Sequence, residues 1–284
     1  MTGQLRIAVP NKGRLAEPSA ALLRQAGIRF ERTERSLAVP VADSPIELLF
    51  VRTEDVSELV ADGVAALGIT GLDLVDESGL PITVETDLGF GRCRLVAAVP
   101  DRSLAATIAD FAGFRVATSH PNVVSRFFAD KGIETTTVPL RGSVEVAPKL
   151  DVAEAVVDLV STGSTMLING LRPVVTILES QGVLVTAESD GRDDLTRTVV
   201  TMIRSVVAAR TKRYILMNAP ADTVAEIETI IPGIEAPTVV PLSHDSMVAI
   251  HSVVDADDVW QVLPKLEQAG ASGILVFPIE QMIR

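Results

Sequence analysis

The chain has 284 residues, 47% of them hydrophobic, and a formal net charge of −12. This length and composition predict two or three domains, each able to bury a core of its own. The negative charge argues against a general nucleic-acid or anionic-membrane surface, because such surfaces are bound through clustered Lys and Arg side chains.

Cysteine and histidine usage restricts metal and redox chemistry. A single cysteine, Cys93, excludes an internal disulfide and a multi-cysteine metal site, and the three histidines are scattered. No apolar run reaches the roughly 18–20 residues of a membrane span, and the first residues include no long apolar signal segment. We therefore expect a soluble, cytoplasmic protein that engages neither nucleic acid nor membrane.

The first predicted βα unit carries cations at its turn. Residues 5–9 predict a buried strand, and a turn containing Lys12 and Arg14 precedes the first helix. A further strand, residues 47–52, ends on Arg52. Arginine can contact phosphate oxygens in a bidentate manner, so these three cations are candidate polyphosphate contacts. Solvated surface positions are the alternative.

Residues 62–75 combine a buried strand at 66–69, the small residues Thr70 and Gly71, and a new helix. A similar pattern recurs about 90 residues later, around 157–163, which indicates two α/β lobes. Ligands of open parallel sheets bind outside the carboxyl ends of the strands. Two facing loops of this kind therefore predict a cleft between the lobes.

Residues 87–99 are the predicted crossover between the lobes, and residues 174–188 with the amphipathic stretch 195–212 are predicted to return to the first. Alternation along the crossover puts Arg92 and Arg94 on one face and Cys93 on the other. No histidine lies near Cys93 in sequence to activate it, so we expect a packed thiol rather than a nucleophile.

The second lobe begins with a strand at 114–118, a turn containing His120, a helix at 123–131 and a strand at 134–138. Glu145 follows and is a candidate partner for a magnesium-bound or hydroxylated ligand. A glutamate at a helix start is equally favourable to the helix dipole, so that reading remains open.

A small polar loop, Ser161-Thr162-Gly163-Ser164-Thr165, separates an apolar strand pattern at 153–160 from a helical pattern at 166–171. Its hydroxyls and unpartnered backbone N–H groups at a helix N-terminus favour an anion, and a phosphate best. Asp158, three residues before the loop, would face sugar hydroxyls or a metal. The loop predicts a phosphorylated sugar ligand, with an ordinary capped turn as the alternative.

The last part of the chain predicts strand, helix, strand, strand, helix and strand, at 214–218, 222–231, 237–242, 247–254, 257–269 and 273–277. That order is the split βαβ of a ferredoxin-like domain. One face of its sheet would need a partner. No convergent acid, base or phosphate loop occurs there, which favours a packing or oligomerisation module.

Six short motifs now form a recognisable series: PNKGRL at 10–15, GITGLDLV at 68–75, GFGRCRL at 89–95, RGSVEVAP at 141–148, DLVSTGST at 158–165 and NGL at 169–171. With them the chain resembles ATP phosphoribosyltransferase over essentially its full length, in the long form that carries a third domain. The resemblance implies an α/β fold: a two-lobed catalytic core like a periplasmic binding protein, followed by a C-terminal ferredoxin-like α+β regulatory domain. The implied domains are residues 1–94 with 177–210 as lobe I, 95–176 as lobe II and 211–284 as the regulatory domain.

The implied reaction is the first step of histidine biosynthesis, in which N1 of ATP attacks C1 of phosphoribosyl pyrophosphate and pyrophosphate leaves. Mg²⁺ would be carried with the substrates, with Glu145 and Asp158 as possible protein ligands. L-histidine would act as a feedback inhibitor of a homo-oligomer that assembles from dimers to hexamers.

The resemblance also implies a role for each site residue. The catalytic group surrounding the polyphosphates comprises Lys12, Arg14, Arg52 and Arg92, with Glu145 lining the same site. The phosphoribosyl pyrophosphate group comprises Asp158, Ser161, Thr162, Gly163, Ser164 and Thr165. The nucleotide group comprises Gly71, Asp73 and His120, and the effector group comprises Thr238, Ala271 and Gly273.

Three positions depart from the family pattern. Asp151 and Glu154 stand where the family usually has Gly and Asp, and His120 stands where it has a tyrosine. Two rival functions remain: a two-lobed amino-acid or anion sensor or binding protein without catalysis, and another phosphoribosyltransferase that acts on a free base.

Overall fold

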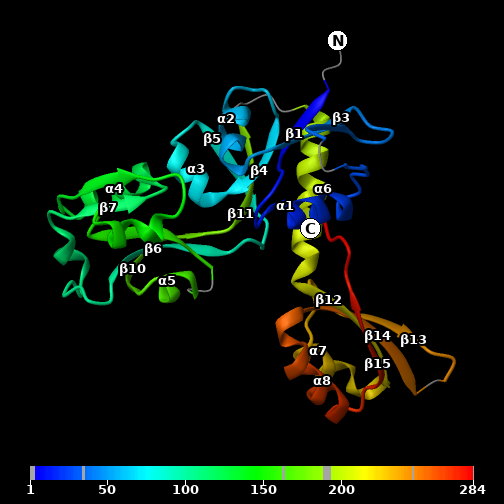
Figure 1. The fold of residues 1–284 in the computed structure, drawn as a ribbon. Coiled ribbons are helices and arrows are strands. Elements are labelled where there is room, and N and C mark those ends of the chain that lie inside the picture. The colour runs from blue at the N-terminus through cyan, green and yellow to red at the C-terminus, as the bar shows by residue number, and fades with distance from the viewer. Residues whose placement is uncertain (1–3, 34–35, 162–163, 188–192, 245, 284) are drawn as a thin grey trace. The chain divides into compact units, whose positions relative to one another are not determined.

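The computed structural model describes residues 4–33, 36–161, 164–187, 193–244 and 246–283 (Figure 1). It divides into two compact units. The first comprises Met1–Ala21 with Ile28–Thr196, and the second comprises Leu22–Gly27 with Arg197–Arg284. Within the described residues, no helix combines the length and apolar character needed to cross a membrane.

The first sheet has the strand order β2-β3-β1-β4-β11-β5. Its strands are β1 (Leu5–Pro10), β2 (Ala38–Pro40), β3 (Ile46–Val51), β4 (Leu67–Gly71), β5 (Ile82–Asp87) and β11 (Gly182–Ala187). The helices α1 (Ala16–Gln25), α2 (Val56–Ala61) and α3 (Leu72–Ser78) connect or follow them. β1 runs parallel to both β3 and β4, so these three strands end at the same edge of the sheet.

The second sheet has the order β10-β6-β9-β7-β8. Its strands are β6 (Cys93–Pro100), β7 (Arg115–Thr118), β8 (Thr136–Pro139), β9 (Ala155–Val160) and β10 (Leu171–Ser180), with helices α4 (Pro121–Asp130) and α5 (Ser164–Ile168). One face is filled by an apolar cluster in which Phe111 and Phe128 stack with ring centroids 5.7 Å apart. β7 runs parallel to β8 and β9, which again brings strand ends to one edge.

Two crossovers join the sheets. The chain leaves the first sheet between β5 and β6 and returns between β10 and β11. β6 and β10 pair in an antiparallel register that sets Cys93 opposite Ser180, so both crossovers lie side by side. This arrangement confirms the expected two-lobed α/β core, and we keep the names lobe I and lobe II for the parts built on the first and second sheet.

Some boundaries differ from the sequence predictions. Thr70 and Gly71 continue strand β4 instead of forming a loop after it. The helix after the polar loop ends at Ile168, and Leu171 begins strand β10. Gly170 has a φ of +67°, a conformation that ends helices, and the apolar residues after it pair with β6.

Gly68 lies where helix α2 approaches strand β4 closely. A Cβ atom there would come 2.5 Å from Val56 Cγ1 and 2.8 Å from Val60 Cγ2. We expect Gly68→Ala to lower the free energy of unfolding by about 1–3 kcal/mol through overpacking. Urea denaturation measures this, and adding Val56→Ala should recover part of the loss. An unchanged denaturation midpoint in the single variant would contradict the close approach.

The second unit contains a four-stranded antiparallel sheet of order β13-β14-β12-β15. Its elements are α6 (Asp194–Arg210), β12 (Lys212–Pro220), α7 (Val224–Ile230), β13 (Thr238–Pro241), β14 (Met247–Asp255), α8 (Val259–Gln268) and β15 (Ser272–Pro278). This order and pairing are those of a ferredoxin-like domain, as predicted. Its core consists of side chains from one sheet face and from α7 and α8, including Met217, Ile227 and Leu266.

The opposite face of this sheet is largely apolar, and no described element of the domain packs on it. We call it the outer face; its members, related by strand register, are Tyr214, Leu216, Val240, His251, Leu275 and Phe277. Leu275 is 48% exposed and Phe277 is 44% exposed. The hydroxyl of Tyr214 lies 2.8 Å from His251 Nδ1.

Candidate active site

The candidate residues of lobe I gather at one edge of its sheet. The turn that carries Lys12 and Arg14 follows β1, Arg52 follows β3, and Asp73 lies in the first turn of α3 after β4. Because β1, β3 and β4 are parallel neighbours, these side chains share the carboxyl edge of the sheet. Lys12 and Arg52 are exposed and form no ion pair in the described part of the chain.

Lobe II presents a matching edge. His120 follows β7 and precedes α4, and Ser161 follows the neighbouring parallel strand β9. Thr162 and Gly163 lie outside the described residues, as do the side chains of Ser164 and Thr165. The predicted phosphate role of this loop therefore stays a prediction, with Ser161 exposed at its start and helix α5 beginning at Ser164.

The two edges meet at a buried carboxylate. Asp73 is 1% exposed, and its carboxylate accepts hydrogen bonds from Ser180 Oγ at 2.5 Å and from Arg14 Nη2 at 3.3 Å. His120, 2% exposed, places Nε2 3.2 Å from the other carboxylate oxygen. Burial alone would raise the pKa of Asp73, but the hydrogen bonds from His120 and Ser180 and the charge of Arg14 hold it below its ordinary value.

Gly71 makes room for this carboxylate. It precedes α3 in an extended conformation, and a Cβ atom on it would overlap Asp73 Oδ1. The three residues assigned to the nucleotide group are thus close together. In this conformation Asp73 and His120 are covered by protein and contact each other.

A second contact between the lobes lies farther along α3. The carboxylate of Glu77 accepts hydrogen bonds from the backbone N–H groups of Asn122 and Val123, each at 3.0 Å. These groups belong to the first turn of α4, whose N–H donors have no partner within the helix. Helices α3 and α4 therefore hold the two lobes together on this side of the cleft.

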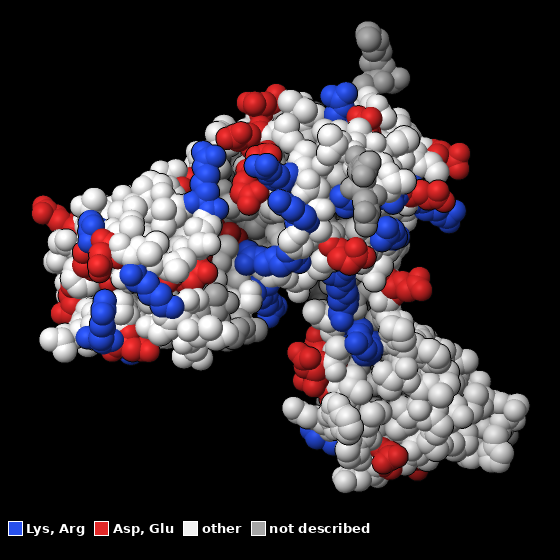
Figure 2. All heavy atoms as spheres, in the orientation of Figure 1, with Lys and Arg blue, Asp and Glu red and all other residues white. Residues whose placement is uncertain are grey.

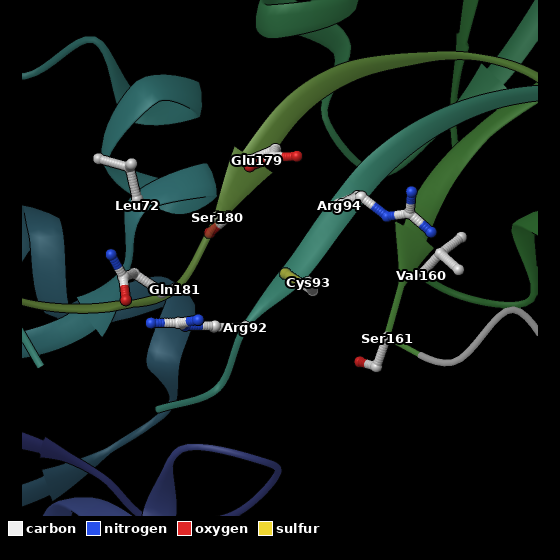
Figure 3. A pocket seen from close by; sticks show the side chains of 9 residues that line it. All are labelled: Leu72, Arg92, Cys93, Arg94, Val160, Ser161, Glu179, Ser180 and Gln181. Carbon is white, nitrogen blue, oxygen red and sulfur yellow. The ribbon is translucent and has the colours of Figure 1, made fainter. Parts of the chain in front are cut away.

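A cavity of about 380 Å³ lies beside the crossover strands (Figure 3). Its lining consists of Leu72, Arg92, Cys93, Arg94, Val160, Ser161, Glu179, Ser180 and Gln181. Figure 3 shows the guanidinium of Arg94 turned toward Val160, at the end of β9. The cavity thus joins one predicted polyphosphate contact, Arg92, to the first residue of the predicted phosphate loop.

Alternation along residues 92–94, at the start of β6, is as predicted: Arg92 and Arg94 are exposed, and Cys93 is buried. Burial raises the pKa of the Cys93 thiol, which suits a packed thiol and not a nucleophile. The sequence reasoning missed Arg94, Glu179 and Gln181 as lining residues. The register that sets Glu179 opposite Arg94 brings together segments 85 residues apart, and no local motif signals that pairing.

Asp158 lies on β9 at this edge, and the charge of Glu145 acts on its carboxylate. Burial raises the pKa of Asp158, and the charge of Glu145 adds to the rise; the Leu159 N–H group and His120 oppose it. Two neighbouring carboxylates suit Mg²⁺, which binds proteins through one or two carboxylates and takes its remaining ligands from water and substrate phosphates. Among the described residues, no three His, Cys, Asp or Glu side chains form a group that could hold a metal by themselves. The donor set therefore fits a metal carried with a substrate.

Figure 2 shows several Lys and Arg side chains close together near the middle of the first unit, with Asp and Glu side chains beside them. An anion can be bound there although the whole chain is acidic, because local charge and not net charge determines the potential in a cleft. The arrangement offers cations, a hydroxyl and carboxylates.

Two of the three positions at which the sequence differs from the family pattern, Asp151 and Glu154, can be explained by their local structure. Asp151 has a φ of +54°, in the left-handed region that favours glycine and that aspartate tolerates better than most residues. Glu154 pairs with Arg115 on the surface, accepting from its backbone N–H at 2.7 Å and from Nε at 3.1 Å. The additional methylene of glutamate, relative to aspartate, lets this carboxylate reach both groups.

Comparison with known proteins bears directly on this site. A family model described as ATP phosphoribosyltransferase matches residues 52–206, and one described as HisG, C-terminal domain, matches residues 209–281. An ATP phosphoribosyltransferase of Gemmatimonas aurantiaca is 43% identical over 291 residues, covering 98% of this chain and 99% of the relative. One of Natronomonas pharaonis is 42% identical over 280 residues, covering 98% and 100%.

Solved structures agree. A chain of the ATP phosphoribosyl transferase (HisG:HisZ) complex from Thermotoga maritima aligns with a TM-score of 0.60 at 29% identity, covering 70% of this chain and 98% of that one. Tv2483 bound to L-arginine aligns with a TM-score of 0.50 at 10% identity, covering 70% and 83%, a likeness that shows the fold alone. Because both family models match and the curated relatives are similar from end to end, the chain belongs to the ATP phosphoribosyltransferase family, in the long form that includes a third domain.

Proposed function

We propose that this chain transfers the phosphoribosyl group of phosphoribosyl pyrophosphate to N1 of ATP, with release of pyrophosphate. The observation that carries the proposal is that two sheet edges meet at the contact between Asp73 and His120. The edge of lobe I carries Lys12, Arg14 and Arg52, and the edge of lobe II carries Asp158 and Ser161. We assign the bounds given above to the domains: residues 1–94 with 177–210, residues 95–176, and residues 211–284.

Each substrate has a proposed place. The loop at 161–165 holds the 5′-phosphate, and Asp158 faces the ribose hydroxyls. The pyrophosphate leaving group lies among the cations Lys12, Arg14, Arg52 and Arg92. ATP binds on the side of the cleft formed by Gly71, Asp73 and His120.

The chemistry requires electrostatics and alignment more than a strong base. As the C1–O bond to pyrophosphate breaks, positive charge develops on the ribose and negative charge on the leaving group. Guanidinium and ammonium groups stabilise the departing pyrophosphate, and the Asp158 carboxylate lies on the side of the positive ribose. Bound Mg²⁺, held by Glu145 and Asp158 together with substrate oxygens, would supply further neutralisation of the pyrophosphate.

A direct assay tests the proposal. The protein is mixed with ATP, phosphoribosyl pyrophosphate and Mg²⁺ in the presence of pyrophosphatase, and the ultraviolet absorbance change of N1-substituted adenine is followed. We expect turnover that requires both substrates. Turnover with a free base but not with ATP would overturn the proposal in favour of another phosphoribosyltransferase, and ligand binding without any turnover would favour a sensor.

We also propose that the second unit binds L-histidine as a feedback inhibitor and assembles a homo-oligomer through its outer face. The effector group is split within one chain: Thr238 lies on β13, and Ala271 and Gly273 lie at the start of β15. These strands are opposite edges of the sheet, about 14 Å apart at the usual spacing of ~4.8 Å per strand. L-histidine is too short to span them, so a site that uses both edges needs a second copy of the chain.

A further inference from the structure

One buried carboxylate connects four segments of the first unit. Asp73 on α3 contacts Arg14 from the turn after β1, His120 from the turn after β7, and Ser180 from the end of β10. Ser180 Oγ also accepts from the backbone N–H of Asp73 at 3.0 Å, which fixes the position of the carboxylate. The carboxylate is inaccessible to a ligand in this conformation, so its effect on a substrate must pass through a neighbour.

Arg14 is the neighbour that reaches outward. Its side chain is 32% exposed, whereas the side chains of Asp73 and His120 are 1% and 3% exposed. A guanidinium has five N–H donors, and Asp73 takes only part of them. The remaining N–H donors of Arg14 can therefore contact an anion while Asp73 holds the guanidinium. Because the side chain is already ordered, binding costs less side-chain conformational entropy.

His120 forms a hydrogen bond with the other oxygen of the Asp73 carboxylate. An ionised carboxylate only accepts hydrogen bonds, so Nε2 of His120 carries the proton toward Asp73. Nδ1 lies 2.9 Å from Ser119 Oγ, and the backbone N–H of His120 donates to Thr118 Oγ1 at 3.0 Å. The imidazole is thus held at Nδ1 by Ser119 of lobe II, and its Nε2 contacts the Asp73 carboxylate of lobe I.

We propose that Asp73 and His120 are positioning residues that hold the Arg14 guanidinium for the pyrophosphate group, and that neither side chain contacts the nucleotide. This inference rests on the proposed function and refines it, because it moves two residues of the nucleotide side to the support of a polyphosphate contact.

A double-mutant cycle tests coupling through Arg14. In the full chain, Asp73→Asn is expected to lower kcat/KM for phosphoribosyl pyrophosphate by about 100-fold, the size of effect typical of a misplaced catalytic group. His120→Phe should act in the same direction, and His120→Gln, which keeps an N–H donor, should recover part of the loss. In an Arg14→Met background, Asp73→Asn should change kcat/KM by no more than about twofold, because the residue through which it acts is already gone.

Glu77→Ala is the matched control. It removes another contact between α3 and α4 and does not touch Arg14. Its effect should be the same with and without Arg14→Met. Circular dichroism verifies that each variant is folded, and should Asp73→Asn fail to fold, the His120→Phe cycle with Arg14→Met gives the same test.

A binding measurement separates this inference from the proposed function. Calorimetric titration with pyrophosphate and Mg²⁺ needs no turnover, and Asp73→Asn should weaken that binding only where Arg14 is present. If the wild-type chain does not convert ATP but Asp73→Asn still weakens pyrophosphate binding only when Arg14 is present, the proposed function is wrong and the positioning role is supported. Three results would each overturn the positioning role. The losses from Asp73→Asn and Arg14→Met could be additive, or Glu77→Ala could show the same coupling to Arg14→Met. Asp73→Asn could also abolish ATP binding while leaving the kinetics with phosphoribosyl pyrophosphate unchanged.

Discussion

Asp158→Asn is expected to lower kcat/KM for phosphoribosyl pyrophosphate by about 100-fold or more, the range found when a single electrostatic contact to a transition state is removed. The substitution keeps the shape of the side chain and removes the charge that faces the developing positive ribose. ATP affinity should survive, because Asp158 is assigned to the ribose of phosphoribosyl pyrophosphate and not to the nucleotide. Steady-state kinetics and separate titrations of the two substrates measure both effects.

The pH dependence follows from the direction of the pKa shift. Burial and the charge of Glu145 raise the pKa of Asp158, so the active carboxylate form is reached only as pH rises through that higher value. In the wild type, kcat/KM should decrease as the pH falls below this pKa. In Asp158→Asn, this decrease at low pH should be absent. Because the pKa of Asp158 is higher in the folded than in the unfolded chain, ionising this carboxyl at higher pH costs free energy of folding. Asp158→Asn removes that cost, so this variant should be at least as stable as the wild type at neutral pH.

Glu154→Gln is the control for Asp158→Asn. It removes a carboxylate of the same lobe that pairs with Arg115 on the surface and lies outside the proposed site. Its kinetics should match those of the wild type. If Asp158→Asn instead lost ATP binding and kept the sugar phosphate, the assignment of lobes to substrates would have to be reversed.

Local patterns were sufficient for the parts of the fold that depend on neighbouring residues. The buried strand, the glycine turn and the helix around Lys12 can be recognised within a few residues, and alternation along 92–94 separates the arginines from Cys93. The repeated strand-and-turn pattern indicated two lobes. The order of six elements after residue 211 indicated the ferredoxin-like domain, because that order alone restricts the possible sheets.

Long-range pairing accounts for what sequence reasoning missed. The resemblance assigned His120 and Asp73 to one group, but not their direct contact: they are 47 residues apart, and the approach of α4 to α3 brings their side chains together. Glu179 joins the cavity because β10 pairs with β6, a strand pair that the helical expectation for 166–171 obscured. Each of these contacts depends on how the two lobes meet, which no local propensity encodes.

Phe277→Asp is expected to abolish assembly through the outer face. The ring is 44% exposed in the single chain, next to Leu275 and paired in register with Tyr214. An aspartate there would bring an unpaired charge into an apolar interface, which costs more than the lost contact. Light scattering should show a smaller particle. Because the proposed effector site needs two copies, inhibition by L-histidine should be lost together with assembly, while transferase activity, built from residues of the first unit, is retained.

Trp260→Asp is the matched control, since this residue is 87% exposed on α8, the helix side of the same domain, and away from the outer face. It makes the same kind of substitution and should change neither particle size nor inhibition. Equal disruption by both variants would point to unfolding of the domain and not to a lost interface. If Phe277→Asp gave a smaller particle that L-histidine still inhibited fully, the effector would bind within one chain. If the wild-type chain were insensitive to L-histidine, the domain would serve assembly only, because an effector can act only through unequal affinity for two states of the protein.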